Sequence, residues 1–452
     1  MIKPHISVYL PSHNYGRFLA DAVESVLRQT VDDWELIVVD DGSTDETPEI
    51  MNRYRAHPQI SLHRTESIGL AAVCNFACAR ARGDYVIRLD GDDIFDENIL
   101  LVLGNALDRD PNLALVFPDY YLLDAFGEIV SHERRERLYT DNHMLDLPPN
   151  GACTLVRASV LKDVGGYRED LGAQDGFDLW SKVAKRYKCA NVNLPLFYYR
   201  RHGTNLTTDT QRIISARREI KRDAVKDKLD LLRPIIGVIP CRRNFDFMPD
   251  LWNQEIGGRS LLDRDIAVCA SSPLFDYIVV TCDNPAAETV VKRHDDSRLR
   301  FFQRDAQSTI RLESIAPTLE RIARSFDPEL KGVTLLRYIQ TPFVTAYTIE
   351  EAITTLAMSD ADSVNGVEEI HSKVFRRTRH GLEPLNGRGP IRSDFDLIYR
   401  DVQSCIATRN RNLPTGSLMG KSQASFTVLP AECFFIDSAH QLQIARLMTE
   451  AP

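Results

Sequence analysis

Acidic side chains follow two short apolar runs in the N-terminal part of the chain. One group, Asp40–Asp41, comes after Glu35–Val39, and the other, Asp90–Asp93, comes after Tyr85–Leu89. In open α/β sheets ligands bind outside the carboxyl ends of the strands, so we expect both groups at one rim. Neighbouring carboxylates repel each other, and a divalent cation with oxygen ligands is the usual remedy. The spacing therefore predicts a metal-assisted ligand site, while Asp45 could equally serve as a helix cap.

Alternating strands and helices should position these side chains. Apolar strands and amphipathic helices follow one another in the βαβ order of a parallel sheet. The expected strands are 6–10, 35–39, 85–89 and 113–117, and the expected helices are 15–29, one after Asp45, 70–82 and 96–109. A charged helix over 211–232 ends before Pro234, after which a second series of the same kind begins. We therefore expect an α/β fold with two nucleotide-binding-type α/β domains in tandem.

At the acidic motifs the N-terminal half resembles the family 2 glycosyltransferases with the GT-A fold. The matching segments are Pro11–Asn14, Ser25–Thr30, Val38–Asp45, Gly83–Tyr85 and Asp90–Asp93. The likeness extends from about residue 5 to residue 207. It implies the nucleotide-diphospho-sugar transferase fold and a transfer of sugar from a nucleotide-sugar donor.

The resemblance also implies roles for single residues of the donor site. Pro11 and Asn14 would contact the donor after the first strand, Asp41 would accept a hydrogen bond from the nucleobase, and Asp90 would lie beside the ribose. Asp92 would hold Mn²⁺ or Mg²⁺ on the diphosphate. Such a cation neutralises the leaving nucleoside diphosphate, which is the main electrostatic demand of the reaction.

Transfer to a hydroxyl also needs a base, and a second acidic motif supplies a candidate. The segment Gly172–Trp180 resembles the acceptor motif of the family, with Gln174 where a glutamate is usual, and it implies Asp175 as the general base. Asp175 could instead cap the following helix, and the two roles do not exclude each other. The segment Tyr199–Asn205 resembles the closing motif of the family, so His202 is either a second metal ligand or a plain loop residue.

The C-terminal half resembles the acylneuraminate cytidylyltransferases, which join CTP to ulosonic sugars. The likeness rests on Gly237–Arg242, Ile278–Asp283, Thr341–Phe343, Ile349–Ala352 and Asp360–Val364. The family wraps the triphosphate in a loop rich in Gly, Ser and Lys, but this chain has the bulky segment Arg243–Pro249 there. Its two-aspartate metal motif has become Phe435-Ile436-Asp437. Arg242 and Asp437 are the remaining candidates, and we expect a retained fold with altered or lost nucleotidyl transfer.

Composition and charge exclude several classes of protein. The chain has 452 residues, 43% of them hydrophobic and 26% charged, which is typical of a folded globular protein with two or more domains. The net charge of -9 offers no basic field for nucleic acid, so we expect no nucleic-acid partner. The nine scattered cysteines indicate reduced thiols. Neither a signal peptide nor an apolar run of about 18 residues is present, so we expect a cytoplasmic protein.

These observations combine into one functional expectation. We expect a GT-A glycosyltransferase domain over 1–208, a helical linker over 209–234 and a cytidylyltransferase-like domain over 235–452. The enzyme would be metal-dependent and inverting, with a UDP-sugar donor and a glycan or lipid-linked acceptor in surface polysaccharide or glycoconjugate synthesis. Peripheral association with the inner face of the membrane and a homo-oligomer stay open. So do two alternatives for the second domain, a bifunctional enzyme that activates an ulosonic acid with CTP and an interaction scaffold.

Overall fold

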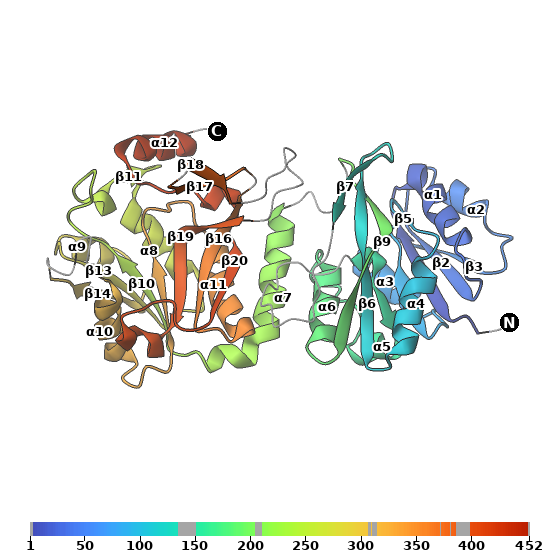
Figure 1. Cartoon of the computed structure of the whole chain (residues 1–452), viewed down its shortest axis with the longest axis horizontal. Helices are drawn as coiled ribbons and strands as arrows, with labels where there is room; N and C mark the ends of the chain where they lie inside the picture. Colours follow the sequence, from blue (N-terminus) through green and yellow to red (C-terminus); the bar gives the residue numbers. More distant parts are fainter. Residues whose placement is uncertain are drawn as a thin grey trace. The chain divides into compact units, whose positions relative to one another are not determined.

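The chain folds into two compact α/β units. The computed structural model describes residues 3–133, 151–203, 210–305, 309, 314–370, 372–379, 381–385 and 398–450. One unit runs up to Ala224 and the other begins at Val225, so that the helix α7 (Thr210–Asp230) spans the division (Figure 1). This helix is the one expected over 211–232, whereas residues 204–209, at the expected domain boundary, lie outside the described part. In the described ranges no helix has both the length and the apolar character needed to cross a membrane.

The first unit is built on a nine-stranded sheet in the order β3-β2-β1-β4-β8-β6-β9-β5, with β7 paired to β6. Its strands are β1 (Ile6–Ser12), β2 (Trp34–Asp41), β3 (Ile60–Thr65), β4 (Tyr85–Arg88), β5 (Ile94–Phe95), β6 (Leu113–Leu123), β7 (Ile129–Glu133), β8 (Leu155–Arg157) and β9 (Lys188–Arg200). The strands from β3 to β4 are parallel, and β8 is antiparallel to both of its neighbours. Every residue of β1, β2 and β4 is buried, as strands covered on both faces require.

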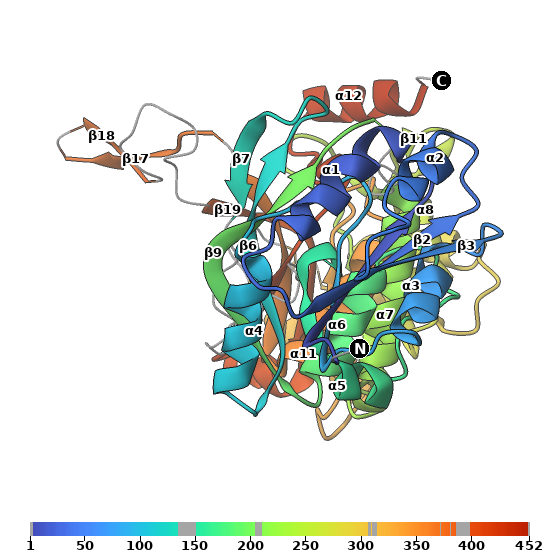
Figure 2. The ribbon, with the colours of Figure 1, turned by 90° about the vertical axis from the view of Figure 1, so that its right-hand side faces the viewer.

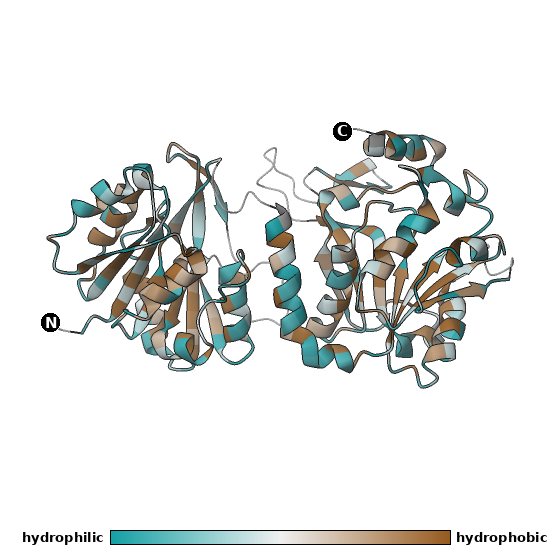
Figure 3. Ribbon diagram, turned by 180° about the vertical axis from the view of Figure 1, so that it is seen from behind, coloured by the Kyte–Doolittle hydropathy of each residue, from teal (hydrophilic) through white to brown (hydrophobic). Residues whose placement is uncertain are grey.

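Helices cover this sheet with their apolar sides. They are α1 (Gly16–Leu27), α2 (Thr47–Asn52), α3 (Leu70–Cys78), α4 (Ile99–Arg109), α5 (Ala158–Asp163) and α6 (Asp175–Ala184). In α1 the buried side chains Phe18, Leu19, Ala22, Val23 and Val26 recur at helical spacing, which forms one apolar stripe toward the core. Figure 3 shows the central strands largely hydrophobic, whereas the helices that cover them carry hydrophilic and hydrophobic residues side by side. The core therefore lies between the sheet and its helices.

The second unit has a seven-stranded sheet in the order β14-β13-β10-β15-β19-β16-β20. These strands are β10 (Ile235–Pro240), β13 (Tyr277–Cys282), β14 (Leu299–Gln303), β15 (Val333–Arg337), β16 (Ser363–Ile370), β19 (Ile398–Arg409) and β20 (Gln423–Thr427). The helices are α8 (Leu261–Ser271), α9 (Ala287–Val291), α10 (Ala316–Phe326), α11 (Ala346–Ser359) and α12 (Ala439–Glu450). Two hairpins, β11 (Glu255–Ile256) with β12 (Arg259–Ser260) and β17 (Phe375–Thr378) with β18 (Gly381–Pro384), lie outside the sheet, and Figure 2 shows β17–β18 standing away from it. The mixed α/β class expected for both halves is confirmed.

Candidate active site

The carboxyl ends of three neighbouring parallel strands form one edge of the first sheet. The register places Ser12 of β1 opposite Asp40 of β2, and Tyr9 of β1 opposite Arg88, the last residue of β4. The two acidic groups predicted after β2 and β4 therefore lie at the same rim, and that expectation is confirmed. This edge is where a ligand of an open α/β sheet binds.

The loops that follow β1 and β2 are tied together at this rim. Asn14 adopts a left-handed backbone with a φ of 58°, which asparagine tolerates better than most residues. Its backbone N–H donates to Ser43 Oγ at 2.8 Å, and its side-chain Oδ1 accepts from the N–H of Thr44 at 2.8 Å. Pro11 is buried within β1 itself. Asn14 therefore fixes the first loop of the candidate donor site against the second, whereas Pro11 lies in the strand before that loop.

Asp45 and Asp41 also hold backbone groups of the protein. Asp45 accepts from the N–H of Gly16 at 2.9 Å and from that of Thr47 at 3.0 Å, the first residues of α1 and α2. Asp45 therefore binds N–H groups at the starts of both helices, although the cap position of α2 itself belongs to Glu46. Asp41 accepts from Thr65 Oγ1 at 2.7 Å and from the N–H groups of Ile68 and Gly69 at 2.8 and 2.9 Å. A carboxylate has about four acceptor positions, so Asp41 keeps room for one further donor.

A buried arginine joins Asp90 to Asp175. Arg88 donates from Nε to Asp90 Oδ1 at 2.5 Å and from Nη2 to Asp90 Oδ2 at 2.7 Å. Its Nη1 donates to Asp175 Oδ2. The candidate ribose ligand and the candidate base are thus brought together on one guanidinium, although 85 residues of sequence separate them.

Asp175 is the first residue of α6, and the capping position before it belongs to Gln174, whose φ is 59°. The alternative interpretation of Asp175 as the helix cap is therefore wrong. The start of α6 approaches another backbone segment closely, because a Cβ on Gly176 would lie 2.8 Å from the Cα of Gly151. A carboxylate at a helix N-terminus is favoured by the helix dipole.

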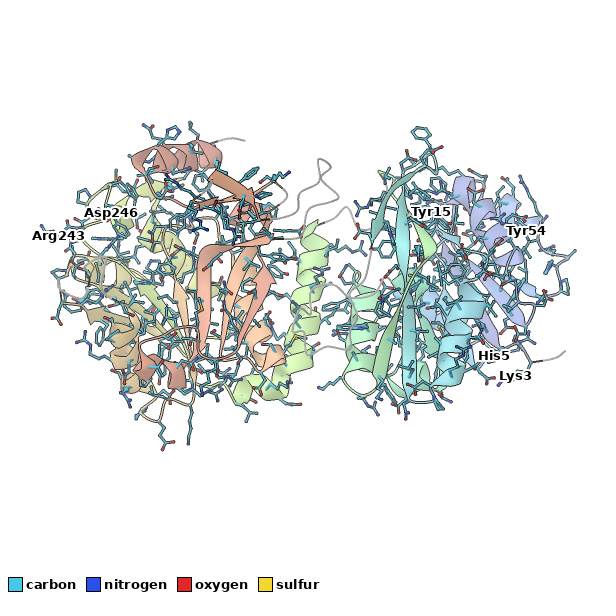
Figure 4. All side chains as sticks on the ribbon, viewed as in Figure 1. Lys3, His5, Tyr15, Tyr54, Arg243 and Asp246 are labelled. Carbon is cyan, nitrogen blue, oxygen red and sulfur yellow. The ribbon has the colours of Figure 1, made fainter. Side chains whose placement is uncertain are left out.

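Asp92 and His202 form a buried pair beside this cluster. His202 Nε2 lies 2.9 Å from Asp92 Oδ2. The imidazole stacks on Phe18 at 5.1 Å and meets the ring of Tyr15, labelled in Figure 4, edge-on at 5.5 Å. Burial, together with the nearby Asp90, raises the pKa of Asp92 to about 6, although the hydrogen bond with His202 opposes this. A buried and packed imidazole that contacts a predicted metal ligand is no plain loop residue.

A divalent cation fits this pair only together with other ligands. Within the described residues, no group of three or more His, Cys, Asp or Glu side chains is arranged to hold a metal. Asp92 and His202 would therefore supply the protein ligands, and phosphate oxygens and water would complete the shell, as is common for Mg²⁺ at nucleotide sites. The raised pKa of Asp92 reports a carboxylate that lacks water, and a cation would stabilise its charged form.

Two arginines of the site were missed in the sequence. Arg88 is the one charged residue of the otherwise apolar β4, and such an interruption was the available signal. Arg200 donates from Nε to the carbonyl oxygen of Asp92 at 3.0 Å, and its N–H donates to Asp93 Oδ1 at 2.9 Å. Arg200 therefore fixes the backbone of the acidic motif from the end of β9, a long-range contact that spacing does not reveal.

The two candidates in the second unit lie in different surroundings. The guanidinium of Arg242 lies 4.8 Å from the ring centre of Phe245 and 3.8 Å from the carboxylate of Asp246. Asp437 is exposed, in the segment that precedes α12. Arg242 is thus engaged with its own loop.

Comparison with known proteins gives a family match within the first unit, together with several similar proteins. Residues 7–164 match the family model "Glycosyl transferase family 2". Chondroitin synthase of Escherichia coli is 25% identical over 203 residues, which are 45% of this chain and 30% of that relative. The putative glycosyltransferase EpsE of Bacillus subtilis is 31% identical over 187 residues, 39% of this chain and 66% of that relative. The crystal structure of S. aureus TarS 1-349 in complex with UDP-GlcNAc has 19% identity and a TM-score of 0.42, over 50% of this chain and 66% of that one.

The chain thus spans only part of the length of these relatives. It covers 30%, 22% and 21% of the chondroitin synthase of Escherichia coli and of the chondroitin and hyaluronan synthases of Pasteurella multocida. The family match itself ends at residue 164 and so lies within the first unit.

Proposed function

With residues 7–164 forming a family 2 glycosyltransferase domain, we propose that the protein transfers a sugar from a nucleotide-sugar donor to a hydroxyl acceptor. The observation that carries this proposal is the guanidinium of Arg88, which holds Asp90 and Asp175 at one rim of the sheet. Asp90 would accept from the ribose of the donor, and Asp175 would face the acceptor. The contact thus brings Asp90, the carboxylate proposed to bind the sugar donor, and Asp175, the proposed base, to one edge of the sheet.

The transfer follows as a single displacement. The acceptor oxygen forms a bond to the anomeric carbon while the bond from that carbon to the diphosphate breaks. Asp175 takes the hydroxyl proton, and the nucleoside diphosphate leaves with the bonding electrons. One displacement of this kind inverts the anomeric configuration.

The donor would be held by the rim residues. Asp41 keeps an acceptor position for a nucleobase N–H, and Asn14 and Pro11 shape the loop beside it. Mn²⁺ or Mg²⁺, held by Asp92 and His202, would supply positive charge for the diphosphate. A UDP-sugar is the donor that we propose.

The acceptor that we propose is a growing glycan or a lipid-linked sugar. The names of the chondroitin and hyaluronan synthases among the relatives support synthesis of a surface polysaccharide or glycoconjugate. A lipid-linked acceptor would require the protein to work at the inner face of the membrane.

Donor hydrolysis tests this proposal without knowledge of the acceptor. The purified chain is incubated with UDP-glucose, UDP-N-acetylglucosamine, UDP-glucuronate and GDP-mannose, each with Mn²⁺, and nucleoside diphosphate release is measured. We expect release from a UDP-sugar, and NMR of the first sugar formed should show the inverted anomer. Failure of the folded protein to bind UDP with Mn²⁺ by calorimetry, or release of the retained anomer, would contradict the proposal.

For the second unit we propose an interaction module without efficient nucleotidyl transfer. In the segment expected to wrap the triphosphate, backbone N–H groups donate within the protein. They are those of Arg243 to Asp283 Oδ1 (2.7 Å), Phe245 to the Met248 carbonyl (3.2 Å), Met248 to the Phe245 carbonyl (3.3 Å) and Asp250 to the Arg243 carbonyl (2.6 Å). N–H groups that are already paired are not available to phosphate oxygens, which supports loss of that chemistry. Arg243 and Asp246 of this segment are labelled in Figure 4.

A further inference from the structure

Arg88 is buried at the centre of the candidate active site. It ends β4, and only 5% of its surface is exposed. All three of its hydrogen bonds described above go to carboxylates, two to Asp90 and one to Asp175. These partners are the two acids to which separate functions are proposed.

The charges of Arg88, Asp90 and Asp175 stabilise one another in this buried position. Burial by itself would lower the pKa of Arg88, but the charges of Asp175 and Asp90 raise it well above its usual range. A buried charge that loses its partner is strongly destabilising, so the guanidinium keeps both carboxylates in place. The cluster holds one positive and two negative charges, and its stability depends on all three groups.

The planar fork of arginine sets the spacing between the two carboxylates. Nε and Nη2 engage Asp90 side by side, which leaves Nη1 directed at Asp175. A lysine would supply the charge as a single point without this fixed geometry. Backbone packing supports the same spacing, because a Cβ on Gly151 would lie 3.5 Å from Arg88 Nη1 and 3.1 Å from the Cα of Gly176.

We propose that Arg88 is a positioning residue that couples the donor site to the base. It fixes Asp175 at a set distance from Asp90, so that the acceptor hydroxyl meets the anomeric carbon only when the donor ribose lies on Asp90. Each carboxylate oxygen that accepts from Arg88 retains a second lone pair, which leaves Asp90 able to accept from the ribose and Asp175 from the acceptor. This inference rests on the glycosyl transfer proposed above, and it adds a residue for which neither the sequence motifs nor the comparisons gave a role.

The test compares Arg88→Lys with a matched control on the neighbouring strand. Arg157 ends β8 and donates to the carbonyl oxygens of Leu113 and Leu107 at 2.7 Å each, so Arg157→Lys removes a fork of purely structural use. Hydrolysis of the UDP-sugar that the wild type cleaves fastest is followed at several donor concentrations. We expect Arg88→Lys to lower kcat by roughly 10²-fold, since small misplacements of reacting groups have effects of that size, with donor KM changed less than threefold. Arg157→Lys should keep kcat within about threefold of the wild type, because its contacts lie outside the reacting groups.

A double-mutant cycle separates positioning from folding. If Arg88 acts through Asp175, then Arg88→Lys should have little further effect on kcat in the Asp175→Asn background. Additive losses, or an unchanged kcat in a folded Arg88→Lys enzyme, would overturn the inference. Should Arg88→Lys fail to fold, Arg88→Gln in the same cycle tests the same point, because its neutral amide lacks both the charge and the three-nitrogen fork of the guanidinium. An unchanged kcat in Asp175→Asn alone would instead contradict the proposed base, so the two failures are distinguishable.

Discussion

Asp92 is a buried carboxylate for which we propose metal binding, a role that depends on its negative charge. Its carboxylate contacts His202, and burial beside Asp90 raises its pKa to about 6. We expect Asp92→Asn to keep the fold but to weaken UDP binding in the presence of Mn²⁺ by at least roughly tenfold, since a neutral amide is a poor ligand for a hard cation. Calorimetry with UDP, with and without Mn²⁺, measures this.

Asp110→Asn is the control for that change, because Asp110 lies in an exposed turn, where it accepts from the N–H of Asn112. Its UDP affinity should equal that of the wild type. If folded Asp92→Asn binds UDP with full dependence on Mn²⁺, Asp92 is not a metal ligand.

Asp175 can be tested for base catalysis separately from binding. We expect Asp175→Asn to lower turnover by roughly 10²–10⁴-fold, because the amide cannot accept the hydroxyl proton, while UDP affinity stays nearly unchanged. Asp178→Asn is the control for a structural loss at the same place, since it removes a buried charge, paired with Lys182, from the first turn of the same helix. Equal losses of binding and turnover in Asp175→Asn would point to a structural role.

The acidic side chains of the site could be predicted from the sequence, but the arginines that bind them could not. Runs such as Asp40–Asp41 and Asp90–Asp93 are visible because they interrupt apolar strands, and the parallel register then brings them to one edge. Arg88 and Arg200 act on residues remote in sequence, Asp175 and Asp92. Their geometry depends on how β4, β9 and α6 pack, which spacing alone does not contain.

Asp45 links two helices, and it should make stability depend on pH. Burial alone would raise the pKa of Asp45, but hydrogen bonds from Thr47 and Gly16 outweigh it and lower the pKa below its usual value. A lowered folded-state pKa stabilises the native state above the unfolded pKa, and this contribution is lost as the pH falls through the folded value. We expect Asp45→Ala to lower the stability by about 1 kcal/mol at pH 7.

Denaturant unfolding at several pH values measures that change. The difference between Asp45→Ala and the wild type should shrink below about pH 4, where the wild-type carboxylate takes up a proton. Glu46→Ala is the control, since Glu46 occupies the capping position of α2 without a side-chain cap bond. A difference that stays constant from pH 7 to pH 3 would show that the charge of Asp45 does not contribute.

The start of α6 depends on a glycine pair. A Cβ on Gly176 would lie 2.8 Å from the Cα of Gly151, and neither backbone can yield easily. We expect Gly176→Ala to displace Asp175 and lower turnover by roughly tenfold or more, as small misplacements do. Gly104→Ala lies inside α4 with its nearest contact at 3.4 Å, so it should keep turnover and raise stability by roughly 0.5–1 kcal/mol. Equal turnover in the two variants would contradict the importance of this contact.

The sequence located most helices and parallel strands, but it missed some of their ends. The strand expected to end at Phe117 continues to Leu123 as β6, because β9 and β7 pair with its second half. Pairing with strands that are distant in the sequence therefore decides where this strand ends.

At the scale of the whole molecule, the two units differ in where their buried charged side chains lie. The first has buried charges joined across its sheet edge, such as Arg88 with Asp90 and Asp175. The second has a fully buried charge pair, Arg337 with Asp265, inside the fold, where Arg337 also donates to the Ser404 carbonyl. Such a pair specifies packing and offers no group to a ligand. The asymmetry is consistent with a catalytic first unit and an interaction role for the second.

The full chain should therefore fail to activate an ulosonic acid with CTP at a useful rate. Nucleotidyl transfer needs N–H groups and a metal around the α-phosphate, but the N–H groups of Phe245 and Met248 are paired with each other's carbonyls. Phe435 also stands where the expected cytidylyltransferase motif would have an aspartate. We expect pyrophosphate release from CTP and N-acetylneuraminate with Mg²⁺ to stay at background, both in the wild type and in Arg242→Ala and Asp437→Ala. Rapid, Mg²⁺-dependent release that Asp437→Ala abolishes and Asp92→Asn leaves intact would contradict this, and it would establish the second unit as a catalyst in its own right.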